Sequence, residues 1–467
     1  MNYKTINSDD LQYFTSVIGE KNCLNNNEIL YQYSKDYTED LSYLPSVVLI
    51  PESKEQISEL MKHCYQECIP VSVRGAGTGL SGSCLPTHGG VVLSMEKLNK
   101  ILSIDTENFQ AQVQPGVINE QLQMAVQELG LFYPPDPASK GSCTLGGNVA
   151  HSSGGPRCVK YGTTRDFILN LEVVLPNGDI IETGANVLKN STAYNLTQLF
   201  VGSEGTLGIV TKITLKLIPF PKFRALLLCS FYSPEKACQT VPKILQSGVI
   251  PSCLEFIDRK GFDLSITHNQ IPFSLLDNEK AFLLIEVDAF SHDDLFPQME
   301  KINEVLSENE VINVLPADDS NNMEKFWKIR RSIGEVVKKQ SIYKEEDTVV
   351  PRIHLTDIYN KVNELSIKYG FEAVCYGHAG DGNLHINILK NNLSEEQWNN
   401  ELPIAIRELF TECKKYGGTI SGEHGIGLVQ KPYLDIVFNH SHFQLFKGIK
   451  YTFDPKNILN PGKIFDI

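Results

Sequence analysis

Three glycine-rich stretches between residues 74 and 209 constrain the fold of this chain more than any other feature. They are Arg74-Gly-Ala-Gly-Thr-Gly-Leu-Ser-Gly-Ser83, residues 134–162, and Gly202-Ser-Glu-Gly-Thr-Leu-Gly-Ile209. Glycine lets the main chain approach another group closely, so several such loops in one region indicate an extended ligand lying along the backbone. A long dinucleotide would fit.

The first loop spells GxGxxG through Gly77, Gly79 and Gly82. A dinucleotide-binding βαβ unit needs a helix directly after these glycines. Here the loop continues through Cys84-Leu-Pro into another expected strand, which argues against that unit. The backbone N–H groups of such a loop can still converge on a phosphate. The alternative interpretation is a flexible turn.

The pattern of apolar residues and turn residues divides the chain near Pro219. Before it, short strands are expected at 46–50, 91–94, 110–113, 171–175, 180–182 and 209–217, with helices at 54–68, 118–129 and 193–200. After it, strands are expected at 224–231, 282–288, 373–376 and 384–389, with helices at 235–246, 294–306, 323–339, 355–369 and 395–416. Pro242 argues against the helix at 235–246.

Composition narrows the class of protein. The 467 residues are 42% hydrophobic and 21% charged, which is typical of a folded globular chain. The formal net charge of -14 disfavours binding to nucleic acid. No apolar run approaches the ~18 residues of a membrane span, and residues 1–20 lack the pattern of a signal peptide. Eleven cysteines without a CxxC pair favour reduced thiols, so we expect a cytoplasmic chain.

A cluster of histidines and acids carries the second chemical signal. His378 and His385 flank a Gly-Asp-Gly turn, and Glu423-His424 lies in a second glycine-bracketed motif. Two imidazoles and one carboxylate, with open positions, are typical of a catalytic divalent metal site. His378, His385 and Glu423 are therefore the expected ligands, and His424 would be available as a base. The alternative interpretation is that these are buried histidines of an ordinary core.

Residues 43–219 resemble the flavin-binding domain of the vanillyl-alcohol oxidase family, also called the PCMH type. The resemblance implies that the first loop wraps the pyrophosphate of FAD and that the other two line its ribityl chain and isoalloxazine. The implied FAD-binding residues are Arg74, Gly75, Ala76, Gly77, Thr78, Gly79, Leu80, Ser81, Pro135, Asp136, Ser142, Thr144, Gly146, Gly147, Asn148, Ser153, Gly155, Tyr161, Gly205, Ile209 and Asn460. The first loop has no histidine, and His88 and His151 lie elsewhere, which implies noncovalent FAD.

The histidine motifs and the tail at 453–463 resemble the C-terminal domain of FAD-linked oxidases. This branch holds D-lactate dehydrogenases, D-2-hydroxyglutarate dehydrogenases and the glycolate oxidase flavoprotein subunit. The resemblance implies zinc or manganese on the three ligands above, His424 as the proton acceptor, and substrate contacts from Arg330 and Asn387. Lys344 is the third expected substrate-binding residue, one residue out of register with a lysine of the hydroxyglutarate branch, and Gly334 stands in place of that branch's threonine.

These observations predict a dehydrogenase that depends on FAD and a divalent metal, zinc first, and oxidises a D-2-hydroxy acid to the 2-oxo acid. The metal would lower the pKa of the substrate hydroxyl, His424 would take its proton, and the hydride would pass to flavin N5. Residues 134–137, Pro-Pro-Asp-Pro, look more like the lactate and glycolate branch, so D-lactate is favoured. D-2-hydroxyglutarate dehydrogenase and glycolate oxidase subunit are the alternatives within the family. A zinc hydrolase and a nonenzymatic nucleotide-binding scaffold are alternatives of other classes.

The expected fold is α+β, with a PCMH-type FAD-binding domain of two subdomains followed by an α+β substrate, or cap, domain. A C-terminal segment should return to the flavin. The expected boundaries are 1–42 for an N-terminal helical extension, 43–219 for the FAD domain and 220–467 for the substrate and metal domain. The implied partners are a small 2-hydroxy acid and an electron acceptor, either a quinone, a cytochrome or an electron-transfer flavoprotein. No transmembrane segment is expected, but peripheral contact with the inner face of a membrane stays open, because the sequence does not show which electron acceptor is used.

Overall fold

The computed structural model describes residues 2–38 and 41–467, and these divide into two compact units. Unit 1 comprises Met1–Ser153, Thr163–Pro219 and Glu423–Ile467, apart from residues 1, 39 and 40, which lie outside the described residues. Unit 2 comprises Gly154–Gly162 and Phe220–Gly422. The α+β class is confirmed, and the C-terminal segment returns to the first unit as expected. No helix of the described residues is long and apolar enough to cross a membrane.

Unit 1 contains a sheet of four strands in the order β1-β2-β4-β3, in which β4 pairs in parallel with both β2 and β3. Its second sheet has five antiparallel strands in the order β5-β6-β10-β8-β9. The strands are β1 (Cys23–Leu24), β2 (Val47–Leu49), β3 (Val71–Arg74), β4 (Val91–Ser94), β5 (Ile101–Asp105), β6 (Gln110–Val113), β8 (Ile168–Val174), β9 (Ile180–Glu182) and β10 (Ile209–Lys216), with a small pair formed by β7 (Leu131–Phe132) and β11 (Ile218–Pro219).

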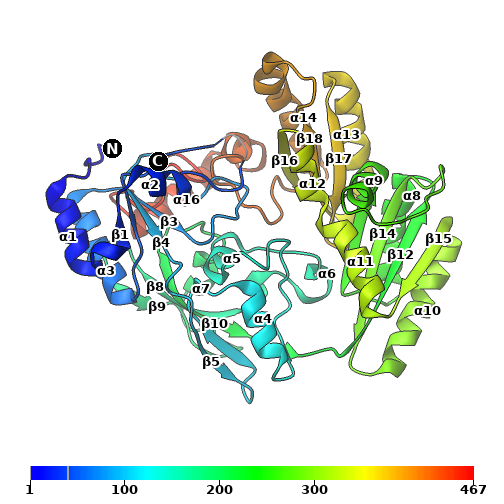
Figure 1. Cartoon of the computed structure of the whole chain (residues 1–467), viewed down its shortest axis with the longest axis horizontal. Helices are drawn as coiled ribbons and strands as arrows, with labels where there is room; N and C mark the ends of the chain where they lie inside the picture. Colours follow the sequence, from blue (N-terminus) through cyan, green and yellow to red (C-terminus); the bar gives the residue numbers. More distant parts are fainter. Residues whose placement is uncertain (1, 39–40) are drawn as a thin grey trace. The chain divides into compact units, whose positions relative to one another are not determined.

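The helices of unit 1 are α1 (Ser8–Ile18), α2 (Asn27–Gln32), α3 (Lys54–Glu67), α4 (Asn119–Gln127), α5 (Leu145–His151), α7 (Leu196–Phe200), α15 (Leu434–Val437) and α16 (His440–Phe453). The expected N-terminal extension is part of the body of this unit. Phe14 and Ile18 of α1 are buried against Ile57 and Leu60 of α3, and the two helices lie side by side in Figure 1. Burial of such side chains contributes about 1.5–3 kcal/mol each, which explains why this segment packs.

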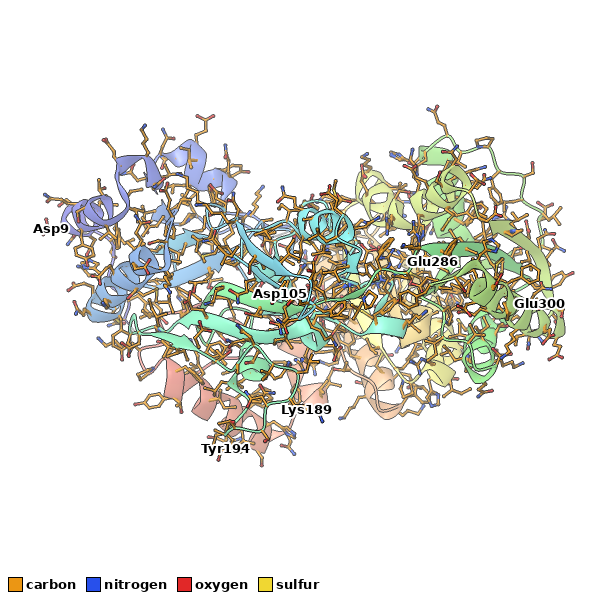
Figure 2. The ribbon with its side chains drawn as sticks, turned by 90° about the horizontal axis from the view of Figure 1, so that it is seen from below. Asp9, Asp105, Lys189, Tyr194, Glu286 and Glu300 are labelled. Carbon is orange, nitrogen blue, oxygen red and sulfur yellow. The ribbon has the colours of Figure 1, made fainter. Side chains whose placement is uncertain are left out.

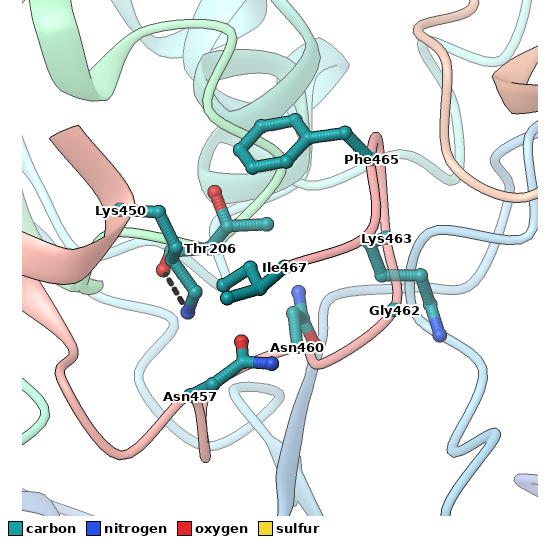
Figure 3. A pocket seen from close by; sticks show the side chains of 8 residues that line it. All are labelled: Thr206, Lys450, Asn457, Asn460, Gly462, Lys463, Phe465 and Ile467. Atoms are coloured by element: carbon teal, nitrogen blue, oxygen red, sulfur yellow. Dashed lines mark hydrogen bonds between the residues drawn. The ribbon is translucent and has the colours of Figure 1, made fainter. Parts of the chain in front are cut away.

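The C-terminal segment is held in unit 1 by buried polar contacts. The Nζ of Lys450 donates to the carbonyl oxygen of Thr206 (Figure 3). It also donates to the carbonyl oxygen of Leu459 and pairs with Asp454 at 2.6 Å. The amide N–H of Val71 donates to Ile458 O at 2.7 Å, beside the start of the first glycine loop. These contacts tie the chain end to the strand that carries this loop.

Unit 2 is built on one antiparallel sheet in the order β15-β12-β14-β13-β17-β18-β16. The strands are β12 (Phe223–Phe231), β13 (Cys253–Asp258), β14 (Ala281–Ala289), β15 (Val311–Ala317), β16 (Tyr343–Val349), β17 (Glu372–Gly377) and β18 (Asn383–Leu389). The helices are α6 (Cys158–Tyr161), α8 (Pro234–Gln246), α9 (Arg259–His268), α10 (His292–Glu308), α11 (Ser320–Arg331), α12 (Ile333–Gln340), α13 (Leu355–Tyr369) and α14 (Leu402–Lys415).

The two faces of this sheet carry different helices. Helices α9, α11 and α12 pack on one face through Phe262, Phe326, Trp327 and Ile333. On the other face α13 contacts β13 through Tyr359 and Phe256, and it packs against α8 and α14 (Figure 1). Because alternate residues of a strand point to opposite faces, each strand divides its side chains between these two environments.

One expected helix is present despite its internal proline, and another is broken in two. Helix α8 runs through Pro242, because an apolar stripe that includes Cys238, Val241 and Ile244 is buried and outweighs the roughly 3 kcal/mol that an internal proline costs. The single helix expected at 323–339 is broken at Ser332 into α11 and α12. The Oγ of Ser332 lies 2.7 Å from Asn269 Nδ2, and this contact with α9 accompanies the break.

Asp258 joins three elements of unit 2, and its loss should destabilise the fold. One carboxylate oxygen accepts from Gly261 N as the N-cap of α9, and the other accepts from Cys375 N in β17, both at 2.7 Å. Burial raises the pKa of this carboxyl to about 6. We expect Asp258→Ala to lower the free energy of unfolding by about 2–4 kcal/mol, because a cap is lost and a buried N–H is left unpaired.

Chemical denaturation of the two proteins measures this difference. Asp319→Ala is the matched control, since Asp319 caps α11 at an exposed position and should cost about 1 kcal/mol. Equal losses for the two variants would contradict the role given to the buried contacts of Asp258.

Candidate active site

Polar side chains follow one another across the face of the unit 2 sheet that packs against α9, α11 and α12. In neighbouring strands the register pairs Asp347 with His385 and His385 with Tyr376. Glu255 lies in the next strand, on the face that Ile257 shares with Tyr376. Most of the remaining side chains of this face are apolar and buried, as Leu226, Leu284 and Leu389 are. A few polar side chains beside an apolar core are typical of a ligand-binding site. We call these side chains the polar row.

His378 and His385 meet in this row. His385 lies in β18, His378 follows β17 directly, and the expected glycine turn between them is present. Gly382 has a φ of +77°, and a Cβ there would lie 1.9 Å from Val350 O, so only glycine fits this turn. The ring centroids of the two histidines are 5.2 Å apart, and a ring nitrogen of each lies within 4.8 Å of the other. One cation could bind both.

The strand β16 brings two carboxylates to the same place. The Oε1 of Glu345 lies 3.7 Å from His385 Nδ1. Asp347 is wholly buried and accepts from the backbone N–H of Gly422 at 2.8 Å and from the Oγ of Ser421 at 3.1 Å. Asp347 therefore anchors the residue that directly precedes Glu423 in the chain. A Cβ at Gly422 would lie 2.5 Å from a methyl of Val349, which explains the glycine.

Arg330 projects from α11 into the row and is buried. Its Nη2 lies 2.7 Å from Glu255 Oε2, and its guanidinium carbon lies 4.7 Å from the centroid of the Tyr376 ring. The Nε is buried and has no hydrogen-bond acceptor among the described residues. A buried guanidinium with an unused donor can bind an anion such as a carboxylate.

The structure places Asn387 among the other expected site residues, but not Lys344. Asn387 is wholly buried, and no described residue satisfies either polar atom of its amide at hydrogen-bond geometry. Lys344 was expected to bind substrate, but it pairs with Ile388 in the register, so it points to the other face of the sheet, 5.1 Å from the centroid of the Trp398 ring. The structure therefore does not bring Lys344 to the other site residues. Glu345 takes the place beside Asn387.

The first and third glycine stretches and residues 134–153 of the second converge in unit 1, as the sequence predicts. A Cβ at Gly75 of the first stretch would lie 2.4 Å from Thr144 Oγ1 of the second. The amide N–H of Glu204 in the third stretch donates to Ala150 O in the second, at 2.8 Å. The side chain of Asn460 accepts from Val73 N and donates to Glu204 O. Asn460 thus joins the strand that leads into the first stretch to the third stretch.

Several of the residues expected to bind FAD also support the loops. The guanidinium of Arg74 donates to Lys35 O at 2.8 Å, and the amide of Asn148 donates to Asn119 Oδ1 at 3.0 Å. Thr144 caps α5, and the carbonyl of Pro135 accepts from Asn119 and Gln123. The other residues of the expected set in unit 1 lie on or beside these loops: Ala76, Gly77, Thr78, Gly79, Leu80, Ser81, Asp136, Ser142, Gly146, Gly147, Ser153, Gly205 and Ile209.

Gly155 and Tyr161 do not lie in unit 1. Residues 154–162 belong to unit 2, where the hydroxyl of Tyr161 donates to Asp288 at 2.7 Å and Lys160 pairs with the same carboxylate. Arg157 lies 3.8 Å from Glu286, which is fully buried and labelled in Figure 2. Alternating acids of β14 hold this short segment, and the glycine pattern alone could not reveal them.

Glu204 is a site residue that sequence reasoning missed. It is buried, and its two carboxylate oxygens accept from Ile426 N at 2.7 Å and Gly427 N at 2.8 Å. Burial raises the pKa of this carboxyl. The carbonyl of Ser81 in the first glycine stretch also accepts from Leu428 N at 2.7 Å. The residues just after His424 are therefore held by the first and third glycine stretches.

The unit 1 loops fit a bound dinucleotide. Among the described residues, the only atom within 4 Å of a Cβ built at Gly79 is His151 Nε2, at 3.8 Å, so these residues leave space beside the first loop. The hydroxyl of Ser81 is buried and unpartnered within the described part of the chain. Open backbone and an unused hydroxyl on a glycine loop suit a phosphate.

Comparison with known sequences identifies the class. Residues 45–184 match the sequence model of an FAD binding domain, and residues 220–464 match that of the C-terminal domain of FAD linked oxidases. The chain is 38% identical to the glycolate oxidase subunit GlcD of Bacillus subtilis. The match covers 98% of this chain and 97% of that subunit. It is 37% identical to a D-lactate dehydrogenase of Anaerostipes hadrus, with 93% of each chain covered. A D-2-hydroxyglutarate dehydrogenase of Stutzerimonas stutzeri is 31% identical, over 93% of this chain and 94% of that one.

Solved structures show the same fold. p-Cresol methylhydroxylase with substrate bound superposes with a TM-score of 0.81 at 19% identity, covering 99% of this chain and 98% of that one. Alkyldihydroxyacetonephosphate synthase gives a TM-score of 0.77 at 19% identity, covering 99% and 87%. The fold and the matched domains thus define an FAD-linked oxidoreductase. The chain belongs to the FAD-linked oxidase family, in the branch of D-lactate, glycolate and D-2-hydroxyglutarate dehydrogenases.

Proposed function

We propose that this FAD-linked oxidoreductase is a metal-dependent dehydrogenase that converts a D-2-hydroxy acid, D-lactate first, to its 2-oxo acid. The observation that carries the proposal is the polar row of unit 2. It brings the imidazoles of His378 and His385 together with the buried Arg330 and Asn387 at one face of the sheet. The amide of Asn387 has no hydrogen-bond partner among the described residues. A 2-hydroxy acid offers a carboxylate and a hydroxyl on neighbouring carbons, which suit such a set. D-lactate dehydrogenases and glycolate oxidase subunits are among the similar proteins.

His378, His385 and Glu423 are the proposed ligands of a divalent metal, zinc first. Imidazole nitrogens and a carboxylate are ligands that zinc takes in catalytic sites. Glu423 directly follows Gly422, which Asp347 anchors beside His385. When bound, the metal supplies a Lewis acid that lowers the pKa of the substrate hydroxyl, and noncovalent FAD supplies the hydride acceptor.

The chain's own groups would bind, orient and deprotonate the substrate. Arg330 would hold the carboxylate through its unused Nε–H. Asn387 would contact the substrate through its unpartnered amide. His424 would accept the proton of the hydroxyl, since it follows Glu423 and lies in a stretch anchored at both ends. Imidazole is the side chain that most often serves as a general base near neutral pH.

The charged side chains on the face of the unit 2 sheet that carries the polar row favour one class of substrate. Glu345 lies beside Asn387, and its Oε1 is 3.4 Å from the hydroxyl of Tyr376. Lys344, the candidate cation for a second carboxylate, points to the opposite face. A dicarboxylate such as D-2-hydroxyglutarate would therefore bring its second carboxylate toward Glu345, and like charges repel. This favours a small monocarboxylate.

The rate of turnover with a dye as electron acceptor tests the preference for D-lactate over D-2-hydroxyglutarate. We expect kcat/KM for D-lactate to exceed that for D-2-hydroxyglutarate by at least about 100-fold, equivalent to about 2.7 kcal/mol. Glu345→Gln should narrow this ratio by about tenfold, because it removes the repulsion and keeps the shape. Lys344→Gln is the matched control and should leave the ratio unchanged. A wild-type preference for D-2-hydroxyglutarate would contradict the proposed substrate.

A further inference from the structure

Glu255 is a buried carboxylate that the catalytic proposal above does not use. It lies in the centre of β13, Cys253-Leu-Glu-Phe-Ile-Asp258, and its side chain is completely inaccessible to solvent. Its register partner in β14 is Leu284, and Ile257 lies two residues along the same face. These two neighbours within the sheet are apolar, so the packing of the strands alone gives no reason for a charge.

Both oxygens of Glu255 are committed to two residues of the polar row. Each lies 2.9 Å from His378 Nδ1, and Oε2 also lies 2.7 Å from Arg330 Nη2. Arg330 and His378 are themselves buried. A buried carboxylate is costly unless it is paired and hydrogen-bonded, and these contacts meet that condition.

The contact with His378 decides which ring nitrogen can bind a metal. An ionised carboxylate only accepts hydrogen bonds, so the Nδ1 between its two oxygens must carry the proton. The lone pair of the neutral ring is then on Nε2. A carboxylate behind a histidine in this way sets the tautomer and the orientation of a metal ligand.

We propose that Glu255 is a positioning residue that orients His378 as a metal ligand and Arg330 as the substrate-binding cation through one shared carboxylate. The inference rests on the function proposed above, and it adds a residue that touches neither metal nor substrate. Because the two partners share one group, the side chain at position 255 determines the metal affinity and the affinity for the substrate carboxylate together.

Two variants separate these roles. In Glu255→Gln the amide oxygen can still accept from His378 Nδ1, whereas the amide NH2 faces a guanidinium that also donates. We expect the affinity for Zn²⁺ to stay within about threefold of wild type, because one acceptor remains. The KM for D-lactate should rise at least about tenfold with little change in kcat, because a displaced Arg330 loses uniform binding.

The double variant Glu255→Leu/Arg330→Leu removes both charges, which avoids leaving one of them buried alone. His378 Nδ1 then has no carboxylate behind it, so we expect the affinity for Zn²⁺ to fall about 10- to 100-fold. The measurement is competition for Zn²⁺ between a chromophoric chelator and the FAD-loaded, metal-stripped protein. Thermal melting confirms that each variant is folded.

Glu279→Gln is the matched control, since Glu279 is a buried glutamate of the same unit that binds Ser230 and Asn313. It should change the melting temperature and leave both the Zn²⁺ affinity and the KM unchanged. Wild-type affinity for Zn²⁺ in the folded double variant, or an unchanged KM in Glu255→Gln, would overturn the positioning role. A wild-type protein that binds no Zn²⁺ would instead contradict the proposed metal function, and this inference with it.

Discussion

Replacing His424 with alanine should leave FAD bound and slow the reduction of the flavin by D-lactate about 10²- to 10⁴-fold, the usual contribution of a general base. The expected loss is large because the backbone around His424 is anchored. Asp347 holds Gly422 on one side, and Glu204 holds Ile426 and Gly427 on the other. Stopped-flow recording of the flavin absorbance under anaerobic conditions measures the rate.

The control for this variant is His440→Ala, which removes an exposed histidine at the start of α16. It should reduce at the wild-type rate. If His424→Ala also kept the wild-type rate, the proton acceptor would have to be another group, and the role given to His424 would be wrong.

Removing the metal should have an effect of similar size. We expect protein dialysed against a strong chelator to keep its FAD and to lose turnover by more than about 100-fold, because the substrate hydroxyl keeps its high pKa without a Lewis acid. Added Zn²⁺ or Mn²⁺ should restore turnover in the wild-type protein. His385→Ala should not recover, because it removes one of the two imidazoles that lie together.

Two controls belong to this measurement. A chelator that is already saturated with zinc should have no effect. His354→Ala changes a histidine of the same unit that pairs with Asp357 and stacks on Tyr416, and it should respond to the chelator and to Zn²⁺ as wild type does. Full turnover of the chelator-treated wild type would rule out the metal.

The glycine loops and the glycine turn were predictable because their local chemistry has few alternatives. The three stretches between residues 74 and 209 converge, and the turn at Gly382 brings His378 and His385 together. In both cases glycines are visible in the sequence, and the structure shows that another residue would clash at positions such as Gly75 and Gly382. A pattern of this kind predicts geometry without knowledge of distant neighbours.

The side chain of Lys344 shows where such reasoning fails. Lys344-Glu-Glu-Asp347 looks like an exposed charged run, but it belongs to a strand in which Glu346 and Asp347 are buried. A shift of one residue moves a strand side chain to the opposite face, and the register is set by pairing with β18, which the local sequence does not show.

Glu255 and Asp347 were missed for a related reason. Each is a buried acid in a strand, and each matters through partners far away in the sequence: His378 and Arg330 for Glu255, and Ser421 and Gly422 for Asp347. One signal was available for Glu255, since a carboxylate between the apolar neighbours Leu254 and Phe256 of a buried strand needs a buried partner. The identity of that partner depends on tertiary structure.

The most direct test of the account is the visible spectrum of the purified protein, recorded without oxygen before and after D-lactate is added, with L-lactate as the stereochemical control. The account predicts a flavin spectrum that D-lactate bleaches and L-lactate leaves unchanged. A flavin band that none of D-lactate, glycolate and D-2-hydroxyglutarate bleaches would contradict the proposed oxidation of a 2-hydroxy acid.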